Sequence, residues 1–230
     1  MIVWMASYPR SGNHYVQVLI NHFYRCLPYD VYLDEELVKR DKYLIERWKK
    51  LIGGYLPKSV DMIAMSKGSD LYFVKTHELP QDDFPAIYLV RDGRDTLISY
   101  ARFILTLEDP DADFISTLRN LIINPRYFGG WERHVLAWTR RQAPTTLIKF
   151  EDLIRTSQPE NMLKQAVAKI GCQLPEALTS APPTFKELHQ TLPEIFRKGR
   201  IGGWQTEMPP ELHDLFWQRH GDAMRVMGYI

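Results

Sequence analysis

Short apolar runs alternate along this chain with longer amphipathic segments. Four runs are apolar enough to predict strands buried on both faces of a sheet: residues 2–7, 71–75, 86–90 and 145–150. Apolar residues recur at three- and four-residue spacing in the segments that we predict as helices: 14–26, 34–51, 94–106, 112–122, 130–142, 159–171 and 210–227. Strands that alternate with helices predict an α/β fold, in which a central parallel β-sheet is flanked by helices.

The composition indicates the class of protein and restricts the kinds of partner that it can bind. Hydrophobic residues make up 45% and charged residues 25% of the chain, which is typical of a globular protein, and the length suits a single domain spanning residues 1–230. The formal net charge is only +1, so no overall basic field indicates a nucleic-acid partner. The sequence has no apolar run of roughly eighteen residues, so we expect no membrane span, and a cytoplasmic location.

The two cysteines, Cys26 and Cys172, lie far apart and form no CxxC pattern. They predict neither a disulfide framework nor a metal site. We therefore interpret both as reduced core residues and expect no metal.

Candidate chemistry follows the first predicted strand, in the stretch SYPRSGNHY at residues 7–15. In open parallel sheets, ligands bind beyond the carboxyl ends of the strands. A turn of small residues around Gly12, followed by a helix N-terminus, can direct backbone N–H groups at a phosphate, and Arg10 adds a cation. An ordinary turn with Ser11 or Asn13 as the N-cap of the helix is the alternative. The stretch is not a P-loop, because GxxxxGK[ST] is absent.

Two other strand ends carry polar groups of the same kind. Lys75 and His77 follow the second strand two residues apart, so a cation and a titratable base point to the same side if the chain stays extended. Arg91 leaves the third strand, and Ser99 falls on the first turns of the next helix. An arginine fork suits a second phosphate contact, although ion pairs with the neighbouring aspartates are the alternative.

A glycine-rich basic loop, FRKGRIGGWQTEM at residues 196–208, lies near the C-terminus. Together with the earlier stretches, and in the same order along the chain, it resembles the PAPS-dependent sulfotransferase family, of the cytosolic type (PAPS is 3'-phosphoadenosine-5'-phosphosulfate). SYPRSGNHY resembles the family's 5'-phosphosulfate loop, VRDGRDTLISY its 3'-phosphate motif and FRKGRIGGW its RKGxxGDW loop. KTHELP is similar to the segment with the catalytic histidine, GGWERHVLAW to GSWxxHVxxW and FEDL to YEDM. The similarity spans residues 2 to about 208.

The resemblance implies a P-loop-like phosphosulfate-binding loop and an enzyme that moves a sulfonate from the co-substrate PAPS to an acceptor hydroxyl, releasing PAP. It implies that His77 is the base, with Glu78 as the alternative base, and that Lys75 and Arg10 neutralise growing negative charge. The implied nucleotide-binding residues are Arg10, Ser11, Gly12, Asn13, His14, Tyr15, Arg91, Ser99, Phe185, Arg197, Lys198 and Gly199. Such electrostatic work needs fixed cations rather than a metal.

Two other functions remain open at this point. A P-loop-like small-molecule kinase would share the first loop but needs Mg²⁺ ligands and a Walker lysine, and a non-enzymatic nucleotide-binding module would have no use for His77. We expect residues 28–66 and 101–128 to shape an acceptor pocket, whose aromatic content suits a phenol, an alcohol, a lipid or a sugar. The expected partner is therefore a small-molecule or glycan acceptor, and a homo-oligomer is compatible with the sequence.

Overall fold

The computed structural model describes residues 1–230 except 33–41, 53, 56–61, 69, 125–127 and 198. Within the described residues, the strands are β1 Ile2–Ser7, β2 Tyr29–Asp30, β3 Gly54–Tyr55, β4 Tyr72–Thr76, β5 Ala86–Val90 and β6 Thr145–Lys149. They form one sheet in the order β3-β2-β4-β1-β5-β6, and every neighbouring pair is parallel. The predicted α/β class with a central parallel sheet is confirmed.

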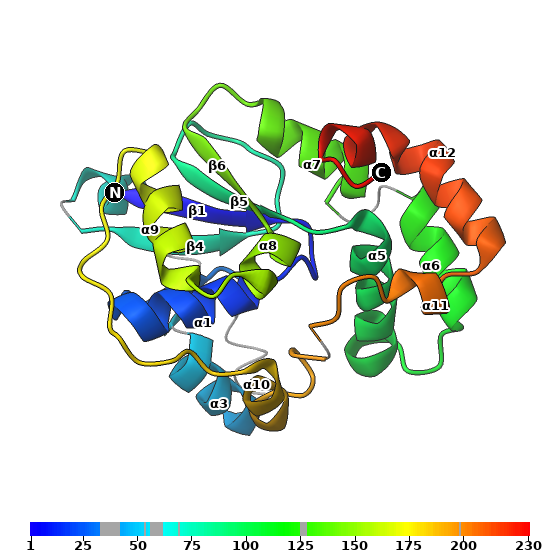
Figure 1. Cartoon of the computed structure of the whole chain (residues 1–230), viewed down its shortest axis with the longest axis horizontal. Helices are drawn as coiled ribbons and strands as arrows, with labels where there is room; N and C mark the ends of the chain where they lie inside the picture. Colours follow the sequence, from blue (N-terminus) through cyan, green and yellow to red (C-terminus); the bar gives the residue numbers. More distant parts are fainter. Residues whose placement is uncertain (33–41, 53, 56–61, 69, 125–127, 198) are drawn as a thin grey trace.

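The helices cover both faces of this sheet (Figure 1). Those around the first face are α1 Asn13–Tyr24, α3 Lys42–Ile52, α8 Phe150–Arg155, α9 Pro159–Lys169 and α10 Phe185–Thr191. Those around the second face are α5 Gly93–Phe103, α6 Phe114–Ile123, α7 Trp131–Arg140, α11 Trp204–Glu207 and α12 Pro210–Val226. A short helix, α4 Met62–Lys67, follows β3, and a π-helical turn, η1 Ile104–Glu108, continues α5.

Alternate residues of each central strand supply the two cores. Met5 and Leu89 pack among the helices of the first face, whereas Ala6 and Tyr88 pack among those of the second face. Burial on both sides explains why these strands are nearly continuous apolar runs. The two cores on one sheet make the chain a single domain.

The carboxyl ends of β1, β4 and β5 meet at one edge of the sheet. From β1, the chain places β4 on one side and β5 on the other, so the strand order reverses at β1. In open parallel sheets, a ligand crevice forms at such a switch point. The loops that follow these three strands therefore come together at the place where a ligand binds.

Differences from the predicted elements are confined to short segments and ends. Within the described part of the chain, the structure adds β2, β3 and the short helices α4, α8, α10 and α11, which are too brief for a periodic signal to reveal. The strand predicted at residues 145–150 ends one residue early, because Phe150 begins α8. The prediction that it is buried on both faces is wrong, because β6 lies at the edge of the sheet and Leu147 is 40% exposed. Of the helix predicted at 34–51, residues 34–41 lie outside the described residues.

We expect acid to destabilise the fold through two buried histidines. His134 is fully buried and His220 is 5% exposed, and burial lowers the pKa of each from 6.5 to about 4. Below pH 6.5 the unfolded chain binds protons at these histidines that the native state does not bind. Their contribution to the free energy of unfolding is therefore fully present above pH 6.5 and is lost as the pH decreases toward 4. The expected loss is about 3 kcal/mol for each side chain.

Urea unfolding at several pH values between 7.5 and 4.5 measures this loss. His220→Gln, which does not titrate, should make the decline in unfolding free energy shallower. A decline as steep as that of the wild type would contradict the assignment to His220.

Candidate active site

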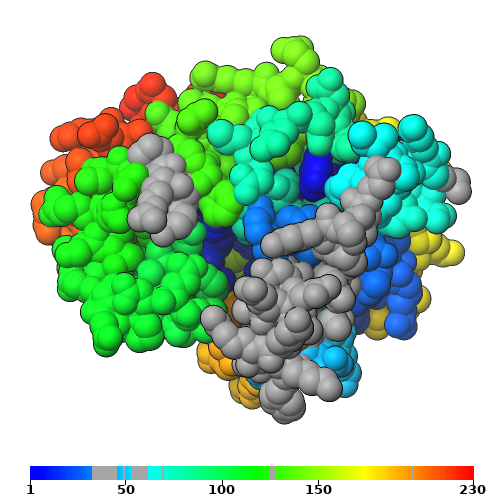
Figure 2. Space-filling model, turned by 180° about the vertical axis from the view of Figure 1, so that it is seen from behind, coloured from blue at the N-terminus to red at the C-terminus, as the bar shows by residue number. Residues whose placement is uncertain are grey.

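A cavity of about 580 Å³ opens at the edge of the sheet where the three strand ends meet. In Figure 2, dark blue atoms from the N-terminal part of the chain are visible at the bottom of a hollow beside the green atoms around α5 and α6. The cavity is lined by the sequence-predicted residues Arg10, Gly12, Asn13, His14, Tyr15, Lys75, His77, Arg91, Ser99, Phe185, Arg197 and Gly199. Ser11 and Glu78 are not among its lining residues, and Lys198 lies outside the described residues.

The loop after β1 leaves the N-terminus of α1 without a side-chain cap. Gly12 occupies the N-cap position with φ at 102°, in the left-handed region. Asn13 instead donates its side-chain N–H groups to the Met5 carbonyl at 2.7 Å and to Ser7 Oγ at 3.1 Å, which ties the loop to β1. The alternative of Ser11 or Asn13 as N-cap is therefore wrong, and the positive end of the helix dipole faces the cavity unneutralised.

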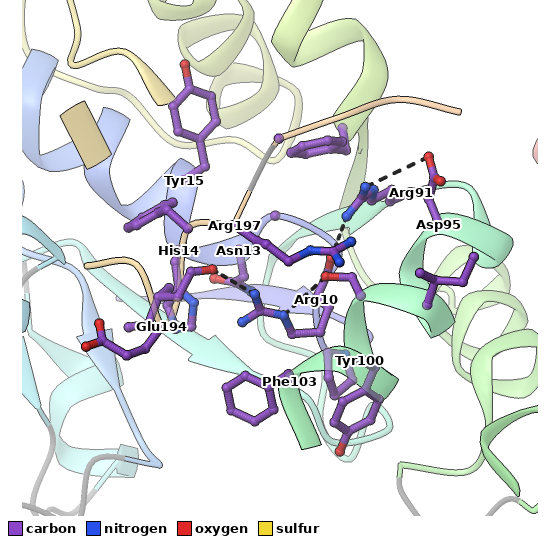
Figure 3. Close-up of a pocket in the computed structure, with 18 of the residues that line it drawn as sticks. Arg10, Asn13, His14, Tyr15, Arg91, Asp95, Tyr100, Phe103, Glu194 and Arg197 are labelled. Carbon is purple, nitrogen blue, oxygen red and sulfur yellow. Dashed lines mark hydrogen bonds and ion pairs between the residues drawn. The ribbon is translucent and has the colours of Figure 1, made fainter. Parts of the chain in front are cut away.

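Three arginines converge on this end of the cavity (Figure 3). Burial, followed by the charges of Arg91 and Arg197, lowers the pKa of Arg10 to about 10. Arg91 donates to the carbonyls of Arg10 at 3.3 Å and Arg200 at 2.8 Å, while its buried Nε has no partner among the described residues. Repulsion among the guanidinium groups and an unused donor are features of a site built for an anion.

Asp95 connects this basic cluster to the glycine-rich loop. Its carboxylate accepts the backbone N–H groups of Gly202 at 2.7 Å and Trp204 at 2.8 Å, and it lies 3.8 Å from Arg91 Nη2. Asp95 does not pair with its sequence neighbour Arg94, which pairs with Asp92 at 2.6 Å instead. Asp95 therefore holds the loop over the arginines, a contact that no local sequence signal indicated.

Aromatic rings form the wall beside the arginines. Tyr15 and Phe185 lie with ring centroids 4.7 Å apart, and Phe150 lies 6.3 Å from Phe185. Gly199 has φ at 57°, and a Cβ there would come within 2.6 Å of Phe185. The close approach of the loop to this ring therefore requires a glycine at 199.

His77 lies at the opposite end of the same edge, and its tautomer follows from its contacts. Its Nδ1 is 2.7 Å from the carbonyl oxygen of Ser7. Because a carbonyl only accepts, Nδ1 carries the proton and Nε2 keeps a lone pair. Burial, followed by the charge of Lys75, holds the pKa of His77 well below its usual value of 6.5, so the ring is neutral at pH 7.

Helix α7 supports the backbone on which His77 stands. His134 Nε2 donates to the His77 carbonyl at 2.9 Å, and Trp138 Nε1 donates to the Glu78 carbonyl at 2.9 Å. The Tyr88 hydroxyl bonds to the other ring nitrogen of His134 at 2.9 Å. These contacts give a physical reason for the histidine and tryptophan of GGWERHVLAW.

The segment FEDL supports the Arg91 loop in a similar way. Glu151 accepts the backbone N–H of Asp92 at 2.9 Å and the hydroxyl of Tyr229 at 2.8 Å. Arg94 Nη2 also reaches the carbonyl of Tyr229, at 3.4 Å. The C-terminal end of the chain is thereby tied to the start of α5.

Several further aromatic side chains line the cavity. Phe103, at the end of α5, and Leu107 and Glu108, in η1, line it together with Tyr32 and Phe128, and the Phe103 ring lies 4.9 Å from the Arg10 guanidinium. Tyr32 and Trp48 come from the predicted range 28–66, and the remaining side chains from 101–128. Both segments expected to shape a pocket therefore contribute to the cavity.

Comparison with known families agrees with this geometry. The family model described as "Sulfotransferase domain" matches residues 2–228. The chain belongs to the sulfotransferase family. Family membership favours a sulfate-transferring enzyme over the kinase and the non-enzymatic module that the sequence left open.

Curated relatives of this sulfotransferase are distant but match most of its length. Sulfotransferase 1E1 of Mus musculus is 22% identical over 252 aligned positions, which cover 96% of this chain and 82% of the relative. Cytosolic sulfotransferase 6 of Arabidopsis thaliana is 20% identical and covers 91% and 74% of the two chains.

Two solved structures share the fold of the sulfotransferase. Mouse sulfotransferase SULT7A1, complexed with PAP, aligns with a TM-score of 0.65 at 17% identity and covers 97% of this chain and 83% of the other. Retinol dehydratase, in complex with androsterone and inactive cofactor PAP, aligns with a TM-score of 0.61 at 21% identity and covers 97% and 80%. Sulfotransferases have a P-loop-like fold, so the predicted fold class, an α/β domain with a P-loop-like loop, is confirmed.

The described residues contain neither a metal cluster nor a membrane-spanning helix. No group of three or more His, Cys, Asp or Glu side chains in this part of the chain could hold a metal ion. No helix described here is long and apolar enough to cross a membrane.

We expect Gly12→Ala to destabilise the sulfotransferase more than Gly171→Ala. Both glycines have positive φ, but a Cβ at Gly12 would lie 2.5 Å from the buried ring of Phe150, whereas Gly171 has nothing within 4 Å. Strain alone should cost Gly171→Ala about 1–3 kcal/mol, and overpacking should add about 1–3 kcal/mol at Gly12. Urea unfolding of both variants measures the difference, and equal losses would show that Phe150 moves aside.

Proposed function

We propose that this sulfotransferase transfers a sulfonate from PAPS to the hydroxyl group of a small, largely apolar acceptor and releases PAP. The observation that carries the proposal is the convergence of Arg10, Arg91 and Arg197 on an uncapped helix N-terminus, in the same cavity as a neutral His77. The PAP complexes of SULT7A1 and retinol dehydratase support the identity of the nucleotide. The unpartnered donor of Arg91 and the close turn at Gly12 fit such an anion.

PAPS supplies a sulfonate attached to a phosphate leaving group. The backbone from Arg10 to His14, with Ser11 included as a backbone contributor, holds the phosphosulfate end at the N-terminus of α1. Arg91, Ser99 and Arg197 hold the 3'-phosphate, with Lys198 and Gly199 of the same loop as neighbours. Tyr15 and Phe185 lie beside the adenine.

His77 takes the proton of the acceptor hydroxyl on its Nε2 as the hydroxyl oxygen forms a bond to sulfur. The bond between sulfur and the bridging oxygen of the 5'-phosphate breaks in the same step. Arg10 and Lys75 stabilise the negative charge that develops on the transferred group and the departing oxygen. The Lys75 ammonium has three N–H groups, of which two contact Asp30 Oδ2 at 2.8 Å and His14 Nε2 at 2.9 Å. No third hydrogen-bond partner of Lys75 lies among the described residues, so one N–H remains for the reacting group.

The aromatic and aliphatic part of the cavity lining favours an apolar acceptor over a glycan. Tyr32, Phe103, Leu107 and Phe128 offer rings and alkyl groups rather than a set of hydrogen-bond partners for many hydroxyls. A phenol or a ring-bearing alcohol, whose one hydroxyl faces His77, matches this surface.

We expect His77→Ala to lower kcat by roughly 10²–10⁴-fold while PAP still binds, because general-base action is lost and the nucleotide contacts remain. Mass-spectrometric detection of sulfonate transfer to a panel of phenols and alcohols measures turnover, and calorimetry measures PAP binding. His22→Ala, at a surface histidine bonded to the Ser180 carbonyl at 3.1 Å, is the matched control. Turnover of His77→Ala within twofold of the wild type would remove His77 from the mechanism and leave Glu78 as the base.

We expect the rate to stay on its plateau as the pH falls below 6.5, since burial holds the pKa of His77 below that value and the ring stays unprotonated. The pH profile of kcat/KM checks this. An acidic limb centred above pH 6.5 would contradict it.

We expect Arg91→Ala to weaken PAP binding about tenfold to a hundredfold, since a charge-assisted hydrogen bond contributes about 1.5–3 kcal/mol. Binding of adenosine 5'-phosphosulfate, which lacks the 3'-phosphate, should change much less. Isothermal titration of both ligands in EDTA measures the two losses. Equal losses would place Arg91 away from the 3'-phosphate.

A further inference from the structure

Strand β2 and the turn after it place two polar side chains beside the two residues of KTH that line the cavity. Asp30 pairs in register with Lys75 of β4. Side chains two residues apart on a strand share a face, so Tyr32, just beyond β2, lies on the side of His77, just beyond β4. The segment Asp30–Tyr32 therefore runs beside Lys75–His77 at the edge of the sheet.

Asp30 contacts both Lys75 and the backbone of Tyr32. Its Oδ2 accepts a hydrogen bond from Lys75 Nζ at 2.8 Å, and its Oδ1 accepts one from the Tyr32 N–H at 2.9 Å. His14 Nε2 also accepts from Lys75, at 2.9 Å. Burial, followed by the charge of Lys75, lowers the pKa of His14 to about 3, so this ring is a neutral acceptor.

Tyr32 contacts His77 by both its hydroxyl and its ring. The hydroxyl accepts the backbone N–H of His77 at 2.6 Å. The two rings stack, with centroids 5.2 Å apart and planes 22° from parallel. Lys75 Nζ also lies 5.3 Å from the centre of the Tyr32 ring, so one aromatic side chain limits the movement of both residues.

The buried ion pair of Asp30 and Lys75 is poorly explained by its contribution to the stability of the fold. Asp30 is 1% and Lys75 4% exposed, and a buried ion pair often stabilises a fold no better than an apolar pair of similar size. Asp30 also lines the cavity rather than the interior of a core. A role in fixing the geometry of Lys75 accounts for a buried carboxylate at this position.

We propose that Asp30 and Tyr32 are positioning residues of the transfer reaction. Asp30 holds the Lys75 ammonium with one N–H left for the reacting group, and Tyr32 holds the His77 ring with Nε2 left for the acceptor. This role rests on the proposed function, because it acts through the two residues assigned there. A displacement of about 1 Å at such groups is enough to lower a rate about a hundredfold.

The test is a double-mutant cycle with PAPS and a nitrophenol as substrates. We expect Asp30→Asn to lower kcat about 10- to 100-fold, with changes of less than about threefold in the acceptor KM and in the Kd for PAP. Because Asp30 acts through Lys75, Asp30→Asn combined with Lys75→Met should have the kcat of Lys75→Met alone, within twofold. This double variant leaves no buried charge unpaired, so it tests the proposal even if Asp30→Asn alone does not fold. Asp82→Asn is the matched control, since Asp82 accepts a hydrogen bond from Trp4 Nε1 at 3.0 Å on the same domain, away from the cavity lining.

Tyr32→Phe tests the second contact separately. It keeps the ring over His77 and removes only the hydroxyl, so we expect a kcat about three- to tenfold lower. The melting temperature should fall slightly, because the backbone N–H of His77 loses its acceptor. A kcat of Asp30→Asn within twofold of the wild type would overturn the proposal for Asp30. Independent, multiplicative effects of Asp30→Asn and Lys75→Met would overturn it as well.

An NMR measurement separates this proposal from the proposed function. A Lys75 ammonium held by Asp30 should give a slowly exchanging ¹⁵N–¹H signal, which Lys75→Met removes and Asp30→Asn broadens. If this signal behaves as expected but the wild type transfers no sulfonate to any acceptor, the proposed function fails and the Asp30 contact stands. If the wild type transfers sulfonate but Asp30→Asn leaves the signal unchanged, only the positioning role fails.

Discussion

The hydrogen bond from His77 Nδ1 to the carbonyl of Ser7 joins the ends of β4 and β1, and the chemistry of the site depends on it. It fixes the proton on one ring nitrogen and leaves the other as an acceptor. Helix α7 then holds the carbonyls of His77 and Glu78 through His134 and Trp138. Backbone geometry thus gives His77 a defined tautomer, with Nε2 as the nitrogen that can accept a proton.

The other end of the cavity gathers three positive charges, although Arg91 lies 3.8 Å from Asp95 and Arg197 3.5 Å from Glu207. Arg10, Arg91 and Arg197 repel one another, and α1 presents an uncapped N-terminus to the same space. The surrounding contacts, from Asp95 to the glycine-rich loop and from Glu151 to the Arg91 loop, hold these groups together against that repulsion. An anionic ligand bound here would therefore reduce the electrostatic repulsion among the three guanidinium groups of the folded protein.

The sequence was sufficient for those parts of the structure whose signal is local. The four principal strands are mostly apolar runs, and Arg10, Lys75, His77 and Arg91 could be found because each lies at or just beyond the carboxyl end of a strand. Asp30 and Asp95 could not, because their roles depend on the strand register between β2 and β4 and on a loop 107 residues away. A two-residue strand has no periodicity to detect. Asn13 was predicted as part of the phosphate loop or as the N-cap of the helix, and no sequence pattern indicated that its side chain donates to the Met5 carbonyl.

The π-helical turn η1 carries Leu107 and Glu108 into the cavity immediately after the rigid helix α5, whose first turns carry Asp95 and Ser99. A π-turn contains one residue more than an α-turn, so it is the form left by a single insertion in a helix. Removal of that residue would rotate the following side chains by about 100° around the helix axis, because an α-helix has 3.6 residues per turn. The half of α5 that carries Asp95 and Ser99 would keep its register. Gain or loss of one codon can therefore change the part of the cavity lining that η1 carries, while the first turns of α5 stay unchanged.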